Sequence, residues 1–236
     1  MATYVLIHGA WHGGWCWRSV APALRRAGHE VYAPSLTGLG ERKHLAHAGI
    51  NLDTHIEDVV SLMEMEDLRE VILLGHSYGG MVVTGAADRS ARVGQLVYLD
   101  AFVPENGKCL LDYAVPERAA RMREEGEKAG AVTPPPMSLW GLTQKEHLEF
   151  VGPREVRHPF GTMAQRIRLE NADKLARLPR TYIYCSQPAT GSFDQFAARY
   201  RNDPAWRFHE LKTGHDAMLL VPGQVIEILL QTASRR

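Results

Sequence analysis

The segment Gly75-His76-Ser77-Tyr78-Gly79-Gly80 carries the strongest chemical signal in the sequence. It directly follows the apolar run EVILL and opens a segment with helical spacing. A serine on a tight strand-to-helix turn needs glycines two positions to either side, because the chain folds back on itself there. Such a turn lifts the hydroxyl above a sheet and points free N–H groups of the helix at developing negative charge. We therefore predict that Ser77 is a nucleophile.

A serine hydroxyl attacks efficiently only when a base removes its proton, and the base for this kind of turn is a histidine later in the chain. The chain has 11 histidines, of which His215 in LKTGHDAM lies between the last predicted strand and the final predicted helix. A loop at that place reaches the edge of the sheet where the serine turn lies. We therefore predict that His215 is the general base.

An attacked carbonyl develops an oxyanion, which needs two N–H donors already in place. The usual donors are the residue after the nucleophile, here Tyr78, and the loop after the first strand, here HGAWHGG, in which we predict Ala10. His8 and His12 on this loop make a poor metal site, because no carboxylate accompanies them and their spacing does not place both rings on one face. We predict no metal.

The elements that position these residues alternate between strand and helix. Apolar runs that are continuous, as in parallel strands covered on both faces, predict six strands at 3–8, 29–34, 70–76, 95–100, 181–185 and 206–211. Amphipathic segments predict helices at 19–28, 51–65, 78–91, 194–200 and 222–233. This alternation predicts an α/β fold with an open, parallel sheet and right-handed crossovers.

The alternation fails once, between Val103 and about Leu178. We predict a single domain over residues 1–236 with a mostly helical cap insertion at about 104–178, placed to cover a site at the carboxyl edge of the sheet. Within it, the charge-rich helix 117–128 is predicted to be a solvated face, and TPPP at 133–136 ends it. Trp140 and Phe160 of the insertion, with Phe102, are predicted to form an apolar roof over substrate, although ordinary packing explains these aromatics equally well.

Composition excludes several classes of protein. Lys+Arg and Asp+Glu both number 27, so no net positive field exists to attract nucleic acid or anionic lipid. The longest apolar runs fall well short of the roughly 20 residues of a spanning helix, and the N-terminus has no signal-peptide pattern. We expect no nucleic-acid or membrane partner, a cytoplasmic location and three reduced cysteines, with a homodimer left open.

The motifs HGAWHGGWCW, GHSYGG and TGHDAM resemble those of the plant methyl esterase and hydroxynitrile lyase family and of related bacterial carboxylesterases. The resemblance implies the α/β-hydrolase fold, a six-stranded core with a helical cap, and no cofactor. The resembling lyases carry threonine in place of Gly9 and lysine in place of Asp216, groups that handle the cyanohydrin. Both are missing here, so ester hydrolysis is favoured over cyanohydrin cleavage.

The acid of the expected Ser-His-Asp triad departs from that resemblance. In the plant relatives it follows the penultimate strand, but CSQPATGSFDQF has no aspartate at that place. Two candidates remain, of which Asp100 is favoured, because several α/β hydrolases take the acid from the strand after the nucleophile helix. Asp194 is the alternative, although it also suits the start of the helix at QFAARY. Asp216 ranks last, because neighbouring side chains in a loop usually diverge.

These residues predict a serine carboxylesterase that hydrolyses a small-molecule ester through an acyl-enzyme. The serine turn does not separate this activity from hydrolysis of a lactone, carbamate or thioester, or from decarboxylation. A non-catalytic ligand receptor on the same fold is the alternative from a different class.

Overall fold

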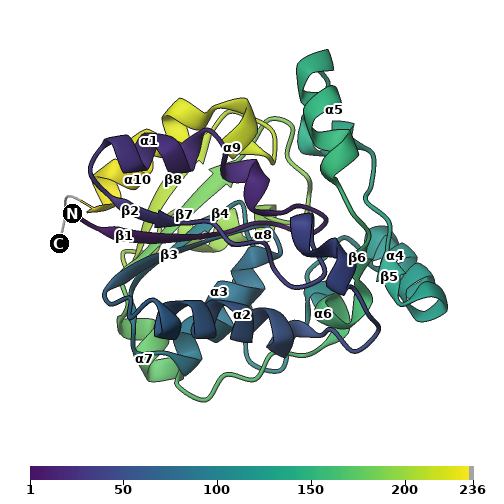
Figure 1. Cartoon of the computed structure of the whole chain (residues 1–236), viewed down its shortest axis with the longest axis horizontal. Coiled ribbons are helices and arrows are strands. Elements are labelled where there is room, and N and C mark those ends of the chain that lie inside the picture. Colours follow the sequence, from purple (N-terminus) through teal and green to yellow (C-terminus); the bar gives the residue numbers. More distant parts are fainter. Residues whose placement is uncertain (234–236) are drawn as a thin grey trace.

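Figure 1 shows the computed structural model of the chain, which describes residues 1–233. Six parallel strands form one sheet in the order β2-β1-β3-β4-β7-β8. All six predicted strands are confirmed, with ends within two residues of the predicted ones. They are β1 (Thr3–Ile7), β2 (Glu30–Tyr32), β3 (Val71–His76), β4 (Val93–Leu99), β7 (Arg180–Cys185) and β8 (Trp206–Leu211).

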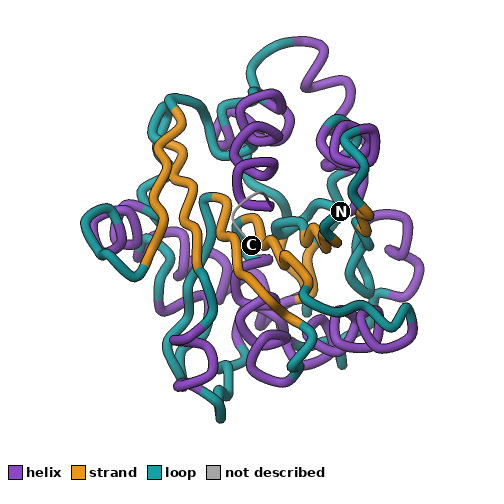
Figure 2. Tube along the Cα trace, turned by 90° about the vertical axis from the view of Figure 1, so that its left-hand side faces the viewer, coloured by secondary structure: helices purple, strands orange, loops and turns teal. Residues whose placement is uncertain are grey.

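Helices cover both faces of this sheet, as Figures 1 and 2 show. One face carries α1 (Val20–Arg26) and α10 (Pro222–Ala233). The opposite face carries α2 (Leu52–Met65), α3 (Gly79–Arg89) and α8 (Asp194–Tyr200). The five predicted helices are therefore confirmed, and in Figure 2 the strands cross the molecule as a twisted layer between them.

Strand residues divide strictly between the two cores. In β1, Tyr4 and Leu6 belong to the cluster under α1 and α10, whereas Val5 and Ile7 belong to the cluster under α2 and α3. Successive side chains of a strand point to opposite faces, so a strand between two helical layers must be apolar at every position. This is why the sequence shows continuous runs instead of alternation.

The insertion between β4 and β7 is mostly helical, as predicted. It holds α4 (Pro116–Ala129), α5 (Lys145–Val151), α6 (Phe160–Ala164) and α7 (Ala172–Arg177), with an antiparallel pair of β5 (Ala131–Val132) and β6 (His158–Pro159). The short α9 (Ala217–Leu220) precedes α10. Short 3₁₀ turns lie at Gly14–Trp17, Gly40–Leu45, Leu110–Asp112, Met137–Trp140 and Gly152–Arg154.

The charge-rich segment 117–128 is helical, as predicted, but it is more than a solvated face. Proline at the first position starts α4, and Gly130 with φ 69° ends it. Met122 and Gly126, four residues apart, are buried on one face. This face turns toward the rest of the molecule, while most of the charged residues lie in water.

In residues 1–233, no helix is both long and apolar enough to cross a bilayer.

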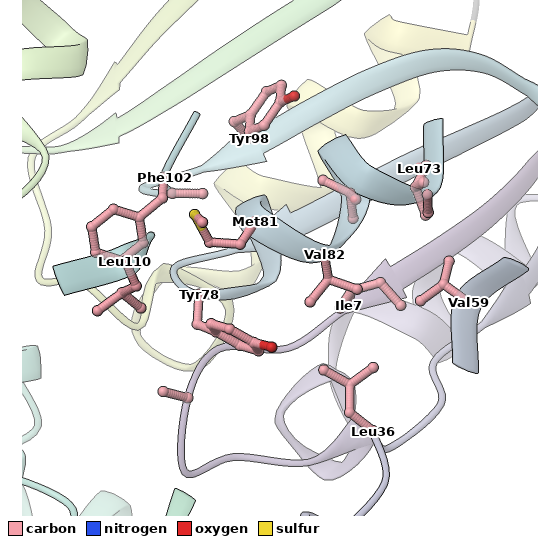
Figure 3. Close-up of a cluster of buried hydrophobic side chains, with 14 of the residues drawn as sticks. Ile7, Leu36, Val59, Leu73, Tyr78, Met81, Val82, Tyr98, Phe102 and Leu110 are labelled. Carbon is pink, nitrogen blue, oxygen red and sulfur yellow. The ribbon is translucent and has the colours of Figure 1, made fainter. Parts of the chain in front are cut away.

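The start of α3 packs unusually close to the end of β4. Figure 3 shows Tyr78 and Met81 of this turn in one buried cluster with Phe102 and Leu110. A Cβ at Gly80 would lie 2.0 Å from the carbonyl oxygen of Phe102, which is backbone and has little freedom to move. Glycine at position 80 is therefore required for the two segments to meet.

We expect Gly80→Ala to lower the free energy of unfolding by roughly 1–3 kcal/mol, because the added methyl group overpacks a backbone contact. Urea denaturation measures the change. Gly223→Ala is the control, because Gly223 lies in α10 with open space around it. Alanine there should raise the free energy of unfolding by less than about 1 kcal/mol. Equal stability of the two variants would contradict the close approach.

Candidate active site

Ser77 lies on the turn between β3 and α3 in a left-handed backbone conformation, with φ 54°. The turn depends on its glycines: a Cβ at Gly75 would lie 2.5 Å from the Gly79 carbonyl oxygen, and one at Gly79 would lie 2.8 Å from that of His8. The backbone of Ser77 is held at the end of β4, because its N–H donates to Leu99 O at 3.3 Å. This is the strained strand-to-helix turn that the sequence predicts.

His215 and Asp100 meet in a buried hydrogen bond. His215 lies in the loop between β8 and α9, and Asp100 follows β4 directly. The Nδ1–H of His215 donates to Asp100 Oδ2 at 2.7 Å, and the N–H of Cys185 donates to Asp100 Oδ1 at 3.1 Å. Both acidic oxygens therefore have partners, and the imidazole is fixed with Nε2 as its remaining nitrogen.

The geometry favours Asp100 over Asp194 as the partner of the base. Asp194 is exposed on the first turn of α8 and accepts a hydrogen bond from the Tyr184 hydroxyl at 2.7 Å. Asp100 reaches His215 because β4 and β7 are neighbours in the sheet, and its N–H donates to Ile183 O at 2.7 Å. A carboxylate at the end of β4 can thus reach a side chain in the loop after β8.

Burial controls the protonation of this pair. It lowers the pKa of His215 to about 4, so the imidazole is a free base at neutral pH. It also raises the pKa of Asp100, against the lowering effect of the Cys185 N–H. Aromatic rings provide the dry surroundings, since Phe193 stacks on His215 at 4.9 Å and Trp140 lies 5.1 Å from it.

Ala10 and Tyr78, the predicted oxyanion donors, both line the cavity that also holds Ser77 and His215. Within residues 1–233, neither backbone N–H donates a hydrogen bond to another residue. Unused N–H groups beside a cavity are suited to bind negative charge there. The Tyr78 side chain points the other way, into the core, where its hydroxyl donates to His55 Nδ1 at 2.8 Å.

A second buried pair links the loop that carries Ala10 to the loop that carries His215. His12 Nε2–H donates to Asp216 Oδ2 at 3.1 Å, and His12 Nδ1–H donates to the Ala10 carbonyl at 2.8 Å. Burial opposes a charge on His12, but Asp216 outweighs it and raises the pKa of His12 to about 9. Asp216 thus forms an ion pair with His12 that joins the two loops, and a carboxylate oxygen of Asp216 also lies within 4.8 Å of a ring nitrogen of His215.

His76 completes this network behind the serine. Its Nε2–H donates to the His215 carbonyl oxygen at 3.1 Å, and its ring lies 4.5 Å from that of His215. Ligand atoms of His76, His215 and Asp216 come within 4.8 Å of one another, which is close enough for a metal site. One atom of each side chain forms a hydrogen bond within the chain, and these bonds tie the loop of His215 to its neighbours, whereas His76 Nδ1 and Asp216 Oδ1 have no hydrogen-bond partner within residues 1–233.

The cavity is narrow, with ≈ 30 Å³ open to water-sized molecules. Two of the three predicted roof residues, Trp140 and Phe102, line it. Phe160 does not, and this prediction is wrong. Its ring packs against Gly126 of α4, where a Cβ would lie 2.1 Å from the ring, because α6 packs against α4.

Sequence reasoning missed several residues that line the cavity, among them Trp11, Leu110, Arg118, Met122, Ser192 and Phe193. A signal existed for two of them, because Arg118 and Met122 are four apart on a helix and share a face. Phe193 and Ser192 reach the site through the loop before α8, which no local pattern reveals.

The sequence matches the family described as "Alpha/beta hydrolase family" over residues 4–228. The chain belongs to the α/β-hydrolase family. The fold class predicted from the sequence is thereby confirmed.

Individual proteins of the α/β-hydrolase family extend the comparison. A carbendazim hydrolyzing esterase from Nocardioides sp. (strain SG-4G) is 40% identical over 240 residues, which cover 97% of this chain and 98% of that protein. Methylesterase 10 from Arabidopsis thaliana is 32% identical over 148 residues, 59% of this chain and 54% of that protein. The structure of an extracellular α/β-hydrolase from a Paenibacillus species has a TM-score of 0.84 at 23% identity, with 98% of each chain covered. The predicted resemblance to plant methyl esterases is confirmed.

The His12–Asp216 pair predicts a pH dependence of stability. Because the pKa of His12 is about 9 in the folded chain and about 6.5 in a free histidine, the pair stabilises fully below pH 6.5 and loses its effect as pH rises through 9. We expect the free energy of unfolding to fall by up to about 3 kcal/mol between pH 6.5 and 9.5.

Urea denaturation at both pH values, in wild type and Asp216→Asn, measures this change. The variant leaves His12 buried without its carboxylate, so its stability at pH 6.5 should already be low and should change little up to pH 9.5. The same loss of stability over this range in both proteins would show that another group is responsible.

Proposed function

We propose that this chain is a serine carboxylesterase that hydrolyses small carboxylic esters through Ser77, His215 and Asp100. The observation that carries the proposal is a buried His215–Asp100 hydrogen bond beside a cavity that Ser77 and two unused backbone N–H groups also line. The esterase and methylesterase relatives support the same class of reaction.

The reaction follows from these positions. The Ser77 oxygen attacks the ester carbonyl carbon and its proton passes to His215 Nε2, while the carbonyl electrons move to the oxygen beside Ala10 and Tyr78 N–H. The intermediate collapses, the bond to the alcohol oxygen breaks, and His215 returns the proton to that oxygen. Water then attacks the acyl-serine with the same base, which releases the acid and restores Ser77.

Asp100 has a supporting role in this mechanism. Its carboxylate holds the proton on Nδ1, which leaves Nε2 facing the cavity to accept a proton from Ser77. Because the site is dry, the imidazole stays neutral until the reaction itself protonates it.

The structure gives cyanohydrin cleavage no support. A side chain at position 9 would begin 2.9 Å from both Ser77 Cβ and His76 Nδ1, so the threonine of the resembling lyases would crowd the serine turn. Where those lyases carry lysine, Asp216 is bound to His12. Neither group that handles a cyanohydrin is present.

Two further features belong to the proposal. The narrow cavity with its aromatic wall suits a small acyl or alcohol group, and no cofactor enters the mechanism. The similarity to a carbendazim hydrolyzing esterase makes carbendazim the second substrate to assay, after simple esters.

A short-chain p-nitrophenyl ester tests the proposed function. We expect turnover with a burst of p-nitrophenol equal to the enzyme concentration when deacylation is slower than acylation, and no turnover with Ser77→Ala. Saturable binding of the ester without release of p-nitrophenol would instead support a ligand receptor on the hydrolase fold.

The identity of the acid has a separate test. Asp100→Asn should lower kcat by about 10⁴, because the amide favours the wrong tautomer of His215, as in other Ser-His-Asp enzymes. Asp194→Asn is the matched control and should retain a rate within a few-fold of wild type, since Asp194 contacts Tyr184. A large loss of kcat in Asp194→Asn together with a near-normal kcat in Asp100→Asn would show that Asp194 is the acid of the triad.

A further inference from the structure

Arg118 is a positively charged residue in the wall of an otherwise mostly apolar cavity. It lies in the first turns of α4 and lines the same space as Ser77 and His215. Its positive charge acts on His215, because Arg118 is one of the groups that lower the pKa of that imidazole. The guanidinium is half-buried, and loss of water lowers its pKa, although the group stays charged at neutral pH.

The guanidinium has no carboxylate partner of its own. Within residues 1–233 it donates to Ser192 Oγ at 3.2 Å and to Thr190 O at 2.9 Å, and no Asp or Glu forms an ion pair with it. A guanidinium has five N–H donors, so these two bonds leave others unused. A charge removed from water without a counter-ion is costly, and an anion that enters the cavity would relieve that cost.

Ser192 adds a second donor at the same place. Its side chain is buried, lines the cavity and accepts a hydrogen bond from Arg118 with its oxygen, so its own O–H can donate to a ligand. A guanidinium and a hydroxyl side by side match the oxygens of a carboxylate. The neighbouring Thr190 hydroxyl is also buried and has no partner in the described part of the chain.

We propose that Arg118 and Ser192 bind a second, ionised acid group of the substrate, so that the preferred esters are half-esters of short dicarboxylic acids. The proposal rests on the proposed function, because the ester end must reach Ser77 while the carboxylate contacts Arg118. Arg118 is thus a specificity-determining residue. A purely structural role, in which Arg118 ties α4 to the 190–192 loop, predicts no difference between charged and neutral esters.

The test compares two esters of nearly equal shape, monomethyl glutarate and methyl 4-carbamoylbutanoate, in which an amide replaces the carboxylate. At pH 7.5 the first is ionised. We expect wild type to have the higher kcat/KM for the charged ester. In Arg118→Gln the ratio of the two kcat/KM values should fall about ten-fold or more, because a charge-assisted hydrogen bond is lost.

Arg121→Gln is the matched control. Arg121 lies three residues along the same helix and is exposed, so the variant removes the same charge without touching the cavity. Its ratio should stay within two-fold of wild type. An unchanged ratio in Arg118→Gln, or an equal fall in both variants, would overturn the proposal.

A measurement on wild type alone covers the case in which Arg118→Gln does not fold. Raising NaCl from 0.05 to 0.5 M should raise KM several-fold for the charged ester and leave that of the amide ester nearly constant. Equal salt responses would overturn the proposal. Turnover of p-nitrophenyl esters with a preference for the neutral amide ester would refute the substrate class and leave the esterase standing, whereas no turnover of any ester would refute the esterase itself.

Discussion

The hydrogen bond between His215 and Asp100 is the interaction on which the rest of the site depends. It joins the loop after β8 to the end of β4 across the intervening strand β7, whose Cys185 N–H holds the other carboxylate oxygen. Polar groups buried this deeply are costly unless each has a partner. The parallel sheet meets this requirement because it brings the carboxyl ends of its strands to one edge, and the site is assembled there.

Two features distinguish the site at this edge of the sheet, a strained backbone and the exclusion of water. The backbone is left-handed at both Ser77 and Asp100, with φ 54° and φ 42°, and Gly75 and Gly79 leave room for the close contacts of the Ser77 turn. Aromatic rings around His215 exclude water and keep the imidazole neutral. The buried His12–Asp216 pair joins the loop that carries Ala10 to the loop that carries His215.

The sequence predicted the parts of this arrangement that local pattern determines. Six continuous apolar runs became the six strands, and the turn at Ser77 was readable because its glycines and the preceding strand are adjacent in the chain. The place of Asp100 at a strand end favours it as the acid, and the order of the strands brings this residue to the loop after β8.

The sequence did not predict which way side chains point when their contacts join segments that lie far apart in the chain. The charges of 117–128 concealed the inward face that carries Arg118 and Met122, and Phe160 pointed toward α4 instead of the serine. The pairing of His12 with Asp216, 204 residues apart, depends on how two loops meet above the sheet. Such contacts are set by the packing of distant elements, which periodicity and spacing do not encode.

The central claim is that the imidazole of His215 activates the hydroxyl of Ser77, and covalent labelling tests it most directly. The protein is treated with a p-nitrophenyl alkylphosphonate and the adduct is located by peptide mass spectrometry. The mechanism predicts one phosphonyl group per chain, on Ser77, with labelling at least 100-fold slower in His215→Ala, in line with the usual contribution of a general base, about 10²–10⁴. An adduct on another residue, or equal labelling rates with and without the imidazole, would contradict it.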